Sequence, residues 1–148
     1  MTARIPSVLC VCVSNAGKSV MAQHLMRHAA GDSITALAAG TNAKTGVNDL
    51  SRQALAELGI EMSGHRPTQL TVELIHAADL VLIVGTQARL DPPPASTPMR
   101  IWDTGEPSLR GIDGIERMRL VREEIAHNVQ TLIGELLTAP TTSDADKR

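Results

Sequence analysis

Residues 7–21 constrain the fold of this chain more than any other stretch. They predict an apolar strand at 8–13, a loop of small residues at 14–17 and a helix at Lys18–Ala30. Backbone N–H groups without partners at the start of such a helix converge with the positive end of its dipole. The sequence therefore predicts an anion site at the carboxyl end of a buried strand.

The spacing of this loop first suggests a nucleotide-binding P-loop, because Gly17, Lys18 and Ser19 match the end of Gly-x-x-x-x-Gly-Lys-Ser/Thr. The first position fails, since Cys12 stands where the opening glycine belongs. No acidic Mg²⁺ ligand follows the later apolar strand, which leads into Gly-Thr-Gln at 85–87. A cysteine above a ring of amides and beside a lysine is instead a nucleophile in an anion hole. Such a site stabilises the thiolate, so we expect Cys12 to be largely ionised at neutral pH, with Ser19 able to donate its hydroxyl to the sulfur.

The pattern Cys12-x5-Lys18-Ser19, with Asn15 between, resembles the Cys-x5-Arg-Ser loop of the low-molecular-weight protein tyrosine phosphatases and of the arsenate reductases built on that fold. The resemblance continues through Ala39-Gly40-Thr41, Leu58-Gly59-Ile60, Asp79-Leu80-Val81 and Trp102 to Pro107. Lysine replaces the loop arginine. Together with Asn15-x-Gly17-Lys18-Ser19 and the run from Glu106-Pro107 to Glu116-Arg117-Met118-Arg119, this replacement looks most like the mycothiol-dependent arsenate reductases.

The resemblance implies that Cys12 attacks arsenate, that Lys18 balances its charge, and that Glu106 protonates the leaving hydroxide. The family places an aspartate directly before a proline in this loop. The matching position here is Glu106, which is one methylene longer, and Asp103 is the fallback acid. The residues expected to hold the oxyanion, for which phosphate or sulfate could stand in, are Val13, Ser14, Asn15, Ala16, Gly17, Lys18 and Ser19.

The resemblance also implies the source of electrons. Thioredoxin-coupled relatives carry resolving cysteines at the end of the third strand and after it, where this chain has Val84 and no later cysteine. An external thiol, mycothiol by resemblance, would therefore take the arsenate, and a mycoredoxin-type redoxin would release arsenite. Arg66 and Arg110 are loop cations within reach of such a thiol. No tightly bound cofactor and no metal is implied.

Two other functions stay open at this point. A phosphatase would use water to resolve a phospho-Cys12, although the ammonium of Lys18 cannot reproduce the bidentate grip of a guanidinium. A non-catalytic anion-binding or regulatory protein could keep the same cradle, since a fold does not determine a function.

The length and charge of the chain limit the remaining function classes. With 148 residues, we expect one domain over 1–139 and a disordered polar tail over 140–148. A net charge of −2 predicts no nucleic-acid or membrane partner, and the lack of a long apolar stretch predicts a soluble, cytoplasmic protein. Cys10 is interpreted as an inert packed thiol. His24 and His28 are interpreted as a solvated surface pair, because no third metal ligand is evident.

Alternating strands and helices predict an α/β fold in three layers, with a four-stranded parallel sheet and helices on both faces. Further strands are expected near 34–39, 80–84 and 99–102, with helices near 48–58, 71–77 and from Asp113, where Asp113-x-x-Glu116 has capping-box spacing. The predicted apolar stripes are Ala22, Leu25, Met26 and Ala29; Leu50, Ala54, Leu55 and Leu58; and Ile115, Met118, Val121, Ile125, Val129, Leu132 and Leu136. Trp102 is expected in the core. The face with Arg117, Arg119, Arg122, Glu123 and Glu124 is expected to be solvated.

Overall fold

The computed structural model describes residues 5–15, 17–44, 46, 48–62, 65–90, 97–104, 111 and 114–138. In this part of the chain four parallel strands form one sheet, namely β1 (Ser7–Cys12), β2 (Thr35–Gly40), β3 (Leu80–Val84) and β4 (Met99–Trp102). The helices are α1 (Lys18–Ala30), the short 3-10 helix η1 (Gly31–Ser33), α2 (Asp49–Ala56), α3 (Val72–Ala77) and α4 (Gly114–Thr138). The predicted α/β class with a four-stranded parallel sheet is confirmed.

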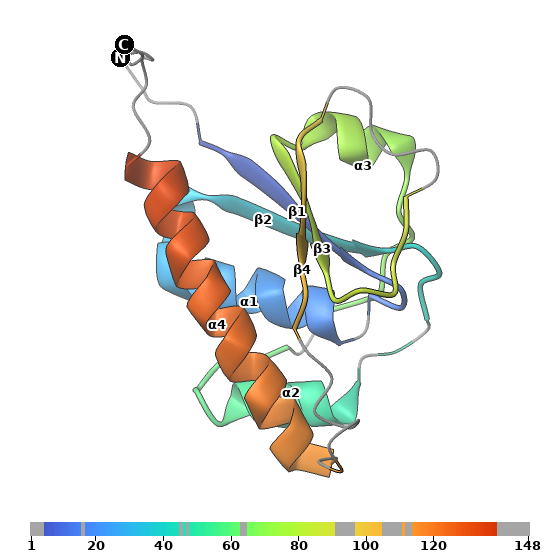
Figure 1. Cartoon of the computed structure of the whole chain (residues 1–148), viewed down its shortest axis with the longest axis vertical. Helices are drawn as coiled ribbons and strands as arrows, with labels where there is room; N and C mark the ends of the chain where they lie inside the picture. Colours follow the sequence, from blue (N-terminus) through green and yellow to red (C-terminus); the bar gives the residue numbers. More distant parts are fainter. Residues whose placement is uncertain are drawn as a thin grey trace.

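The sheet has the strand order β2-β1-β3-β4, so the chain moves outward in both directions from β1. Cys12 at the end of β1 lies in register with Gly40 of β2, and Val11 lies beside Ile83 of β3. Helices α1 and α4 cover one face, with α2 beside α4, and α3 lies on the other face (Figure 1). In open parallel sheets ligands bind beyond the carboxyl ends of the strands where the order reverses. This fold therefore places the end of β1 at the expected binding position.

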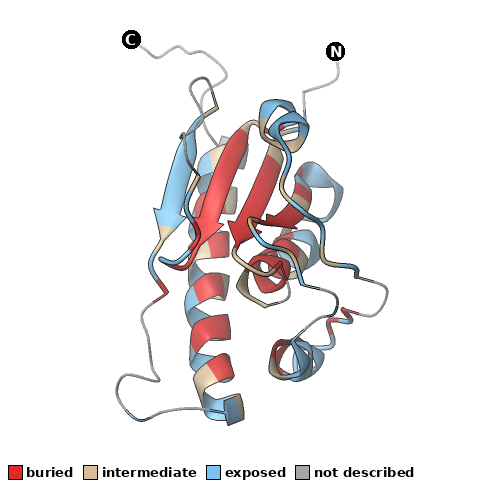
Figure 2. Cartoon of the chain, turned by 90° about the vertical axis from the view of Figure 1, so that its right-hand side faces the viewer, coloured by how far each residue is buried: buried red, intermediate tan, exposed pale blue. Residues whose placement is uncertain are grey.

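Both central strands are buried, whereas the edge strand β4 is largely exposed (Figure 2). Every residue of β3 is buried, which is the pattern of a strand covered on both faces. One core cluster joins the sheet to α1, α2 and α4, and a smaller one lies on the face with α3. Trp102 is partly buried against the larger cluster, which confirms its predicted place in the core.

The buried face of α1 is wider than the sequence predicts. Ser19 to Gln23 form an unbroken buried run, because α4 packs on the side of α1 that the sheet leaves open. The last turn of α1 is exposed, so the prediction that Ala29 is buried was wrong. Leu58 was also predicted to be buried but is 43% exposed. It lies after the end of α2, in the turn that closes that helix, and not on its apolar stripe.

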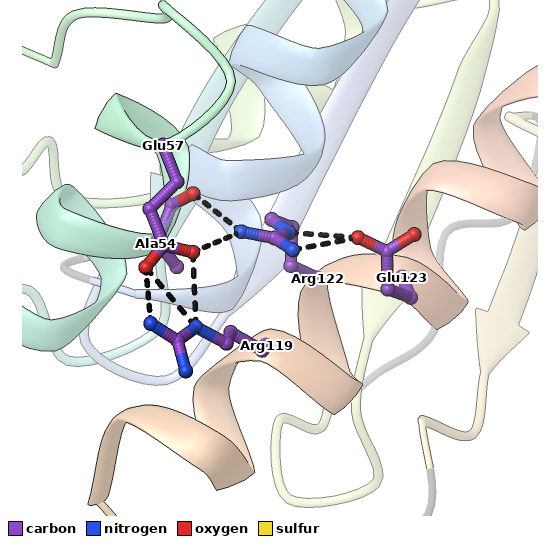
Figure 3. A network of polar contacts seen from close by, with 5 residues as sticks. All are labelled: Ala54, Glu57, Arg119, Arg122 and Glu123. Carbon is purple, nitrogen blue, oxygen red and sulfur yellow. Dashed lines mark hydrogen bonds and ion pairs between the residues drawn. The ribbon is translucent and has the colours of Figure 1, made fainter.

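The charged face of α4 is not uniformly solvated: Arg117 is half-buried, and the most buried member is Arg122. Its side chain is only 10% exposed, and its Nη1 donates to the carbonyl oxygen of Ala54 at 2.8 Å and to Glu57 at 2.7 Å (Figure 3). Arg119 donates to both carboxylate oxygens of Glu57 at 3.0 Å. These hydrogen bonds hold the pKa of Glu57 at about 2. Arg122 also pairs with its neighbour Glu123 at 2.8 Å, but the contacts to Glu57 and Ala54 form a clamp that joins α4 to the end of α2.

The long stripe of α4 is confirmed. Met118, Val121, Ile125, Val129 and Leu132 are buried, and Ile115 and Leu136 pack partly buried against the same cluster. The predicted cap at Asp113 and the predicted disordered tail at 140–148 lie outside the described residues. Among the helices of the described part, none is long and apolar enough to cross a membrane.

Candidate active site

Strand β1 carries two cysteines with different surroundings. Cys10 is completely buried in the larger core cluster, and burial raises the pKa of its thiol to about 12. Cys10 is therefore a packed, protonated thiol, as predicted. Cys12 ends the strand, is 7% exposed and lines a cavity at the carboxyl end of the sheet. Only the second of the two cysteines can meet a ligand from outside.

The loop after Cys12 is held by its carbonyl groups. The backbone N–H groups of Thr41, Asn42 and Lys44 donate to the carbonyl oxygens of Cys12, Val13 and Ser14, at 3.0, 2.7 and 3.0 Å. In a planar trans peptide the carbonyl and the following N–H point in opposite directions. The segment after β2 thus holds three loop carbonyls pointing away from the centre of the loop. The N–H groups that follow them, of Val13, Ser14 and Asn15, therefore point toward its centre. In agreement, the N–H of Asn15 donates to Cys12 Sγ at 3.3 Å.

Asn15 closes the loop in a left-handed conformation, with φ of 52°. Asparagine tolerates this region better than most residues do. It is completely buried; its Nδ2 donates to Ser19 Oγ at 2.9 Å, and its Oδ1 accepts from the N–H of Thr68 at 2.7 Å. Its carbonyl oxygen lies 3.2 Å from Nε2 of His65. The side chains of Asn15 and Ser19 hold the loop and are not among those that line the cavity, and their role in binding the oxyanion stays a prediction.

Ser19 lies beside the sulfur. Cys12 Sγ and Ser19 Oγ are hydrogen-bonded at 3.0 Å, with the neutral thiol as the donor. A hydroxyl can rotate, and its oxygen already accepts a hydrogen bond from Asn15. Once Cys12 loses its proton, the Ser19 hydroxyl is free to donate to the thiolate. Gly17 is the N-cap residue of helix α1 and has no side chain to cap it, so the first N–H groups of the helix also face the loop.

Lys18 lies against the end of β3. Gly85, directly after that strand, has a φ of +97°, and a side chain there would meet Lys18 Cδ and Nζ at 3.3 Å. A residue other than glycine would therefore strain the backbone and displace the lysine. The ladder between β3 and β4 continues through Gly85, whose N–H donates to the carbonyl oxygen of Trp102 at 2.7 Å. Lys18 and the end of β3 together form one wall above Cys12.

The cavity at Cys12 has a volume of about 180 Å³, smaller than the roughly 300–1,000 Å³ of a typical small-molecule pocket. Of the predicted site residues it is lined by Cys12, Val13, Ser14, Gly17 and Lys18. The rest of the lining was not predicted from the sequence: Asn48, Ser51, Val84, Gly85, Thr86, Gln87, Ala88, Arg117 and Met118. The lining within the described residues contains no acidic side chain.

Only one of the two candidate acids, Asp103, lies in the described part of the chain. Glu106, like Ala16 and Arg110, lies outside the described residues, and its role stays a prediction. Asp103 is exposed at the end of β4 and is not among the residues that line the cavity. Arg66 is also exposed and away from the lining.

The histidines of α1 do not form a surface pair. His24 is half-buried, its Nδ1 lies 2.9 Å from the carbonyl oxygen of Val20, and its ring meets that of His65 edge-on at 6.2 Å. Burial lowers the pKa of His24. His28 is exposed. Within the described residues no group of three histidine, cysteine or acidic side chains could hold a metal ion.

The geometry places a cysteine at the switch point of the sheet, inside a loop of inward amides. The family model of the low molecular weight phosphotyrosine protein phosphatases matches residues 7–97. The chain belongs to this family. The match includes the cysteine loop, strand β3 and the segment that follows it.

Relatives of both activities occur in this phosphatase family. The chain is 37% identical over 83 residues to a probable low molecular weight protein-tyrosine-phosphatase, EpsP, of Ralstonia solanacearum. The aligned stretch covers 55% of this chain and 57% of that protein. It is 30% identical over 126 residues to an arsenate reductase of Halalkalibacterium halodurans, covering 82% and 90%. A solved thioredoxin-dependent arsenate reductase of Corynebacterium glutamicum has 29% identity and a TM-score of 0.76, covering 93% of this chain and 64% of that one. The chain thus spans little more than half of EpsP and most of the Halalkalibacterium arsenate reductase.

Proposed function

We propose that the protein is an arsenate reductase in which Cys12 takes up arsenate and passes it to an external low-molecular-weight thiol, with mycothiol as the favoured thiol. The observation that carries the proposal is that Cys12 and Lys18 line the same small cavity, with lysine as the loop cation. An ammonium is a point charge and does not grip two oxygens as a guanidinium fork does, which weighs against phosphoryl transfer. The arsenate reductase of Halalkalibacterium halodurans, which aligns with 82% of the chain against 55% for EpsP, supports the same choice.

In the first step the Cys12 thiolate attacks the arsenic atom of arsenate. A sulfur–arsenic bond forms, one arsenic–oxygen bond breaks, and the departing hydroxide takes a proton to leave as water. The inward amides of the loop and the ammonium of Lys18 offset the charge of the oxyanion. We assign the proton to Glu106, because Asp103 does not line the cavity.

In the second step an external thiolate attacks the arsenic of the Cys12 adduct. The arsenic–sulfur bond to Cys12 breaks, Cys12 is released as a thiolate, and arsenic keeps its oxidation state. A redoxin thiol, of mycoredoxin type, then attacks the sulfur of the conjugate. This last step forms a disulfide and leaves the electron pair on arsenic as arsenite. Cys12 must stay reduced throughout the cycle, so we propose the cytoplasm as its compartment.

The mouth of the cavity supports an uncharged thiol rich in hydroxyl groups. Its exposed lining includes Asn48, Thr86 and Gln87, whose amides and hydroxyl offer hydrogen bonds without charge. Residues 85–90 contain no cysteine, so the segment after β3 has no thiol to resolve the adduct within the chain. Cys10 is buried in the core and cannot replace it.

The second candidate is a phosphatase, and the match of the phosphatase family model to residues 7–97 favours it. In that case water attacks phospho-Cys12. The Lys18→Arg variant separates the two functions, because a fork-shaped cation should raise the hydrolysis of aryl phosphates. If the parent protein already hydrolyses aryl phosphates as fast as ordinary phosphatases do, the phosphatase replaces the arsenate reductase as the proposed function.

The decisive experiment compares electron sources. We expect NADPH consumption with arsenate when mycothiol, mycoredoxin and the mycothione-reducing enzyme are supplied, with a rate that depends on mycothiol concentration. Thioredoxin and its reductase alone should fail, although the Corynebacterium glutamicum relative is named as thioredoxin-dependent. Robust turnover with thioredoxin alone would contradict the external-thiol mechanism.

Mass spectrometry provides the chemical test of the nucleophile. Protein incubated with arsenate should carry an adduct on Cys12, and the adduct should disappear when mycothiol is added. Cys12→Ser should abolish turnover, and an active Cys12→Ser variant would eliminate the covalent mechanism. Binding of anions without turnover under any reducing system would favour the non-catalytic alternative.

A further inference from the structure

Arg117 of α4 lines the same cavity as Cys12 and Lys18, although it is 105 residues away from Cys12 in the sequence. Its neighbour Met118 holds this turn of the helix in place. Met118 is 4% exposed, belongs to the core, and its Sδ lies 3.5 Å from Ser51 Oγ of α2. The first turns of α4 are thus anchored at the cavity by apolar packing.

The electrostatic surroundings of Arg117 differ from those of the other arginines on its helix. Arg119 and Arg122 both donate to the carboxylate of Glu57. Arg117 is half-buried and makes no hydrogen bond or ion pair with any other described residue. A partly desolvated guanidinium without a counter-ion is unfavourable unless an anion can reach it. The cavity that it lines already contains Lys18 and, within the described residues, no carboxylate.

We propose that Arg117 is a second oxyanion-binding residue, which contacts the bound anion from helix α4. The loop cation Lys18 supplies one point charge, whereas the planar guanidinium of Arg117 can donate to two oxygens at once. Both side chains line one cavity of about 180 Å³, which is small enough for one oxyanion to meet both of them. The fork that phosphatases of this family carry in the loop would then come from α4. This inference deepens the proposed function, because it concerns the same oxyanion site.

The test measures anion binding at Cys12 directly and needs no turnover. Iodoacetamide alkylates an accessible cysteine, so bound inorganic phosphate or arsenate should protect Cys12 while the buried Cys10 stays unmodified. The extent of protection of Cys12, plotted against the anion concentration, gives a dissociation constant for each variant. The variants are Arg117→Gln and Arg117→Lys. The charge-matched control is Arg66→Gln, which removes an exposed arginine that does not line the cavity.

We expect Arg117→Gln to weaken phosphate and arsenate binding by about tenfold or more, the size of effect for a lost charged hydrogen bond. Arg117→Lys should recover part of the loss, and Arg66→Gln should bind like the parent. Because Arg117 has no partner among the described residues, thermal unfolding of its variants should match that of the parent. A parent protein in which neither anion protects Cys12 would overturn the inference.

Two further outcomes would overturn the inference. The first is unchanged anion protection in both Arg117 variants. The second is unchanged protection together with a raised KM for mycothiol alone, which would assign Arg117 to the thiol. If Arg117→Gln were too unstable to measure, unchanged protection in Arg117→Lys, which keeps the charge but loses the fork, would decide against the inference. Failure of the arsenate reductase proposal would leave this binding test intact, because phosphate protection does not depend on reduction.

Discussion

Gly40, at the end of β2, should control the shape of the cysteine loop without touching a ligand. It lies in register with Cys12, and a Cβ atom built on it would lie 2.6 Å from the carbonyl oxygen of Val13. It would also lie 2.8 Å from the backbone N of Asn15 and 2.9 Å from its Cβ. All three contacts are with the loop itself, and two are with its backbone. The Gly40→Ala variant therefore has to move either the loop or β2.

The size of the effect follows from these distances. To reach ordinary contact at 3.4 Å, the Val13 carbonyl must move by about 0.8 Å. Overpacking of this kind typically costs about 1–3 kcal/mol in the free energy of unfolding. A misplacement of roughly 1 Å in a reacting group can cost about 10²-fold in rate. We expect Gly40→Ala to lose about 1–3 kcal/mol of stability and about 10²-fold in turnover.

Two assays test this expectation. Urea unfolding measures the stability loss, and protection of Cys12 by phosphate measures the anion site independently of the electron source. Gly46→Ala is the control, because this glycine is exposed in the same connection and a Cβ there meets nothing within 4 Å. A Gly40→Ala protein with parental stability and parental phosphate binding would refute the reasoning that β2 supports the loop.

Three further predictions concern stability. Arg122→Met should cost about 1.5–3 kcal/mol in urea unfolding, because the carbonyl of Ala54 loses a hydrogen bond from a charged donor; an unchanged midpoint would show that the clamp is not stabilising. The pKa of Glu57 is about 2 in the folded protein against an ordinary 4.5, because Arg119 and Arg122 donate to it, so the unfolded state binds more protons between these values. Stability should therefore fall as pH falls from about 4.5 to 2, and Glu57→Gln should flatten that dependence in acid unfolding curves. Cys10→Ala should cost about 1–2 kcal/mol or less in the free energy of unfolding and leave activity within several-fold. Burial raises the pKa of the Cys10 thiol to about 12, so above about pH 9 the thiol ionises only in the unfolded parent protein. The parent should therefore lose stability as pH rises above about 9, and the variant should lose less in urea unfolding.

The sequence was sufficient wherever neighbouring residues decide the structure. Strand β1, the cysteine loop and helix α1 follow one another in the chain. The apolar run of the strand, the small residues of the loop and the start of the helix could therefore be recognised together. The unbroken apolar run of β3 identified a strand covered on both faces, and the alternation of strands with helices identified the α/β class. These features depend on periodicity and turn chemistry, which are local.

Only the tertiary structure decided the far wall of the cavity. Asn48, Gln87 and Arg117 come from three separate segments, and no spacing in the sequence relates them to Cys12. The charge pattern of α4 made Arg117 and Arg122 equivalent members of a solvated face. Packing of α4 against α1 and α2 buried Arg122 at the carbonyl of Ala54 and brought Arg117 to the cavity. A charge is placed by the elements that pack around it, and that packing is a property of the whole fold.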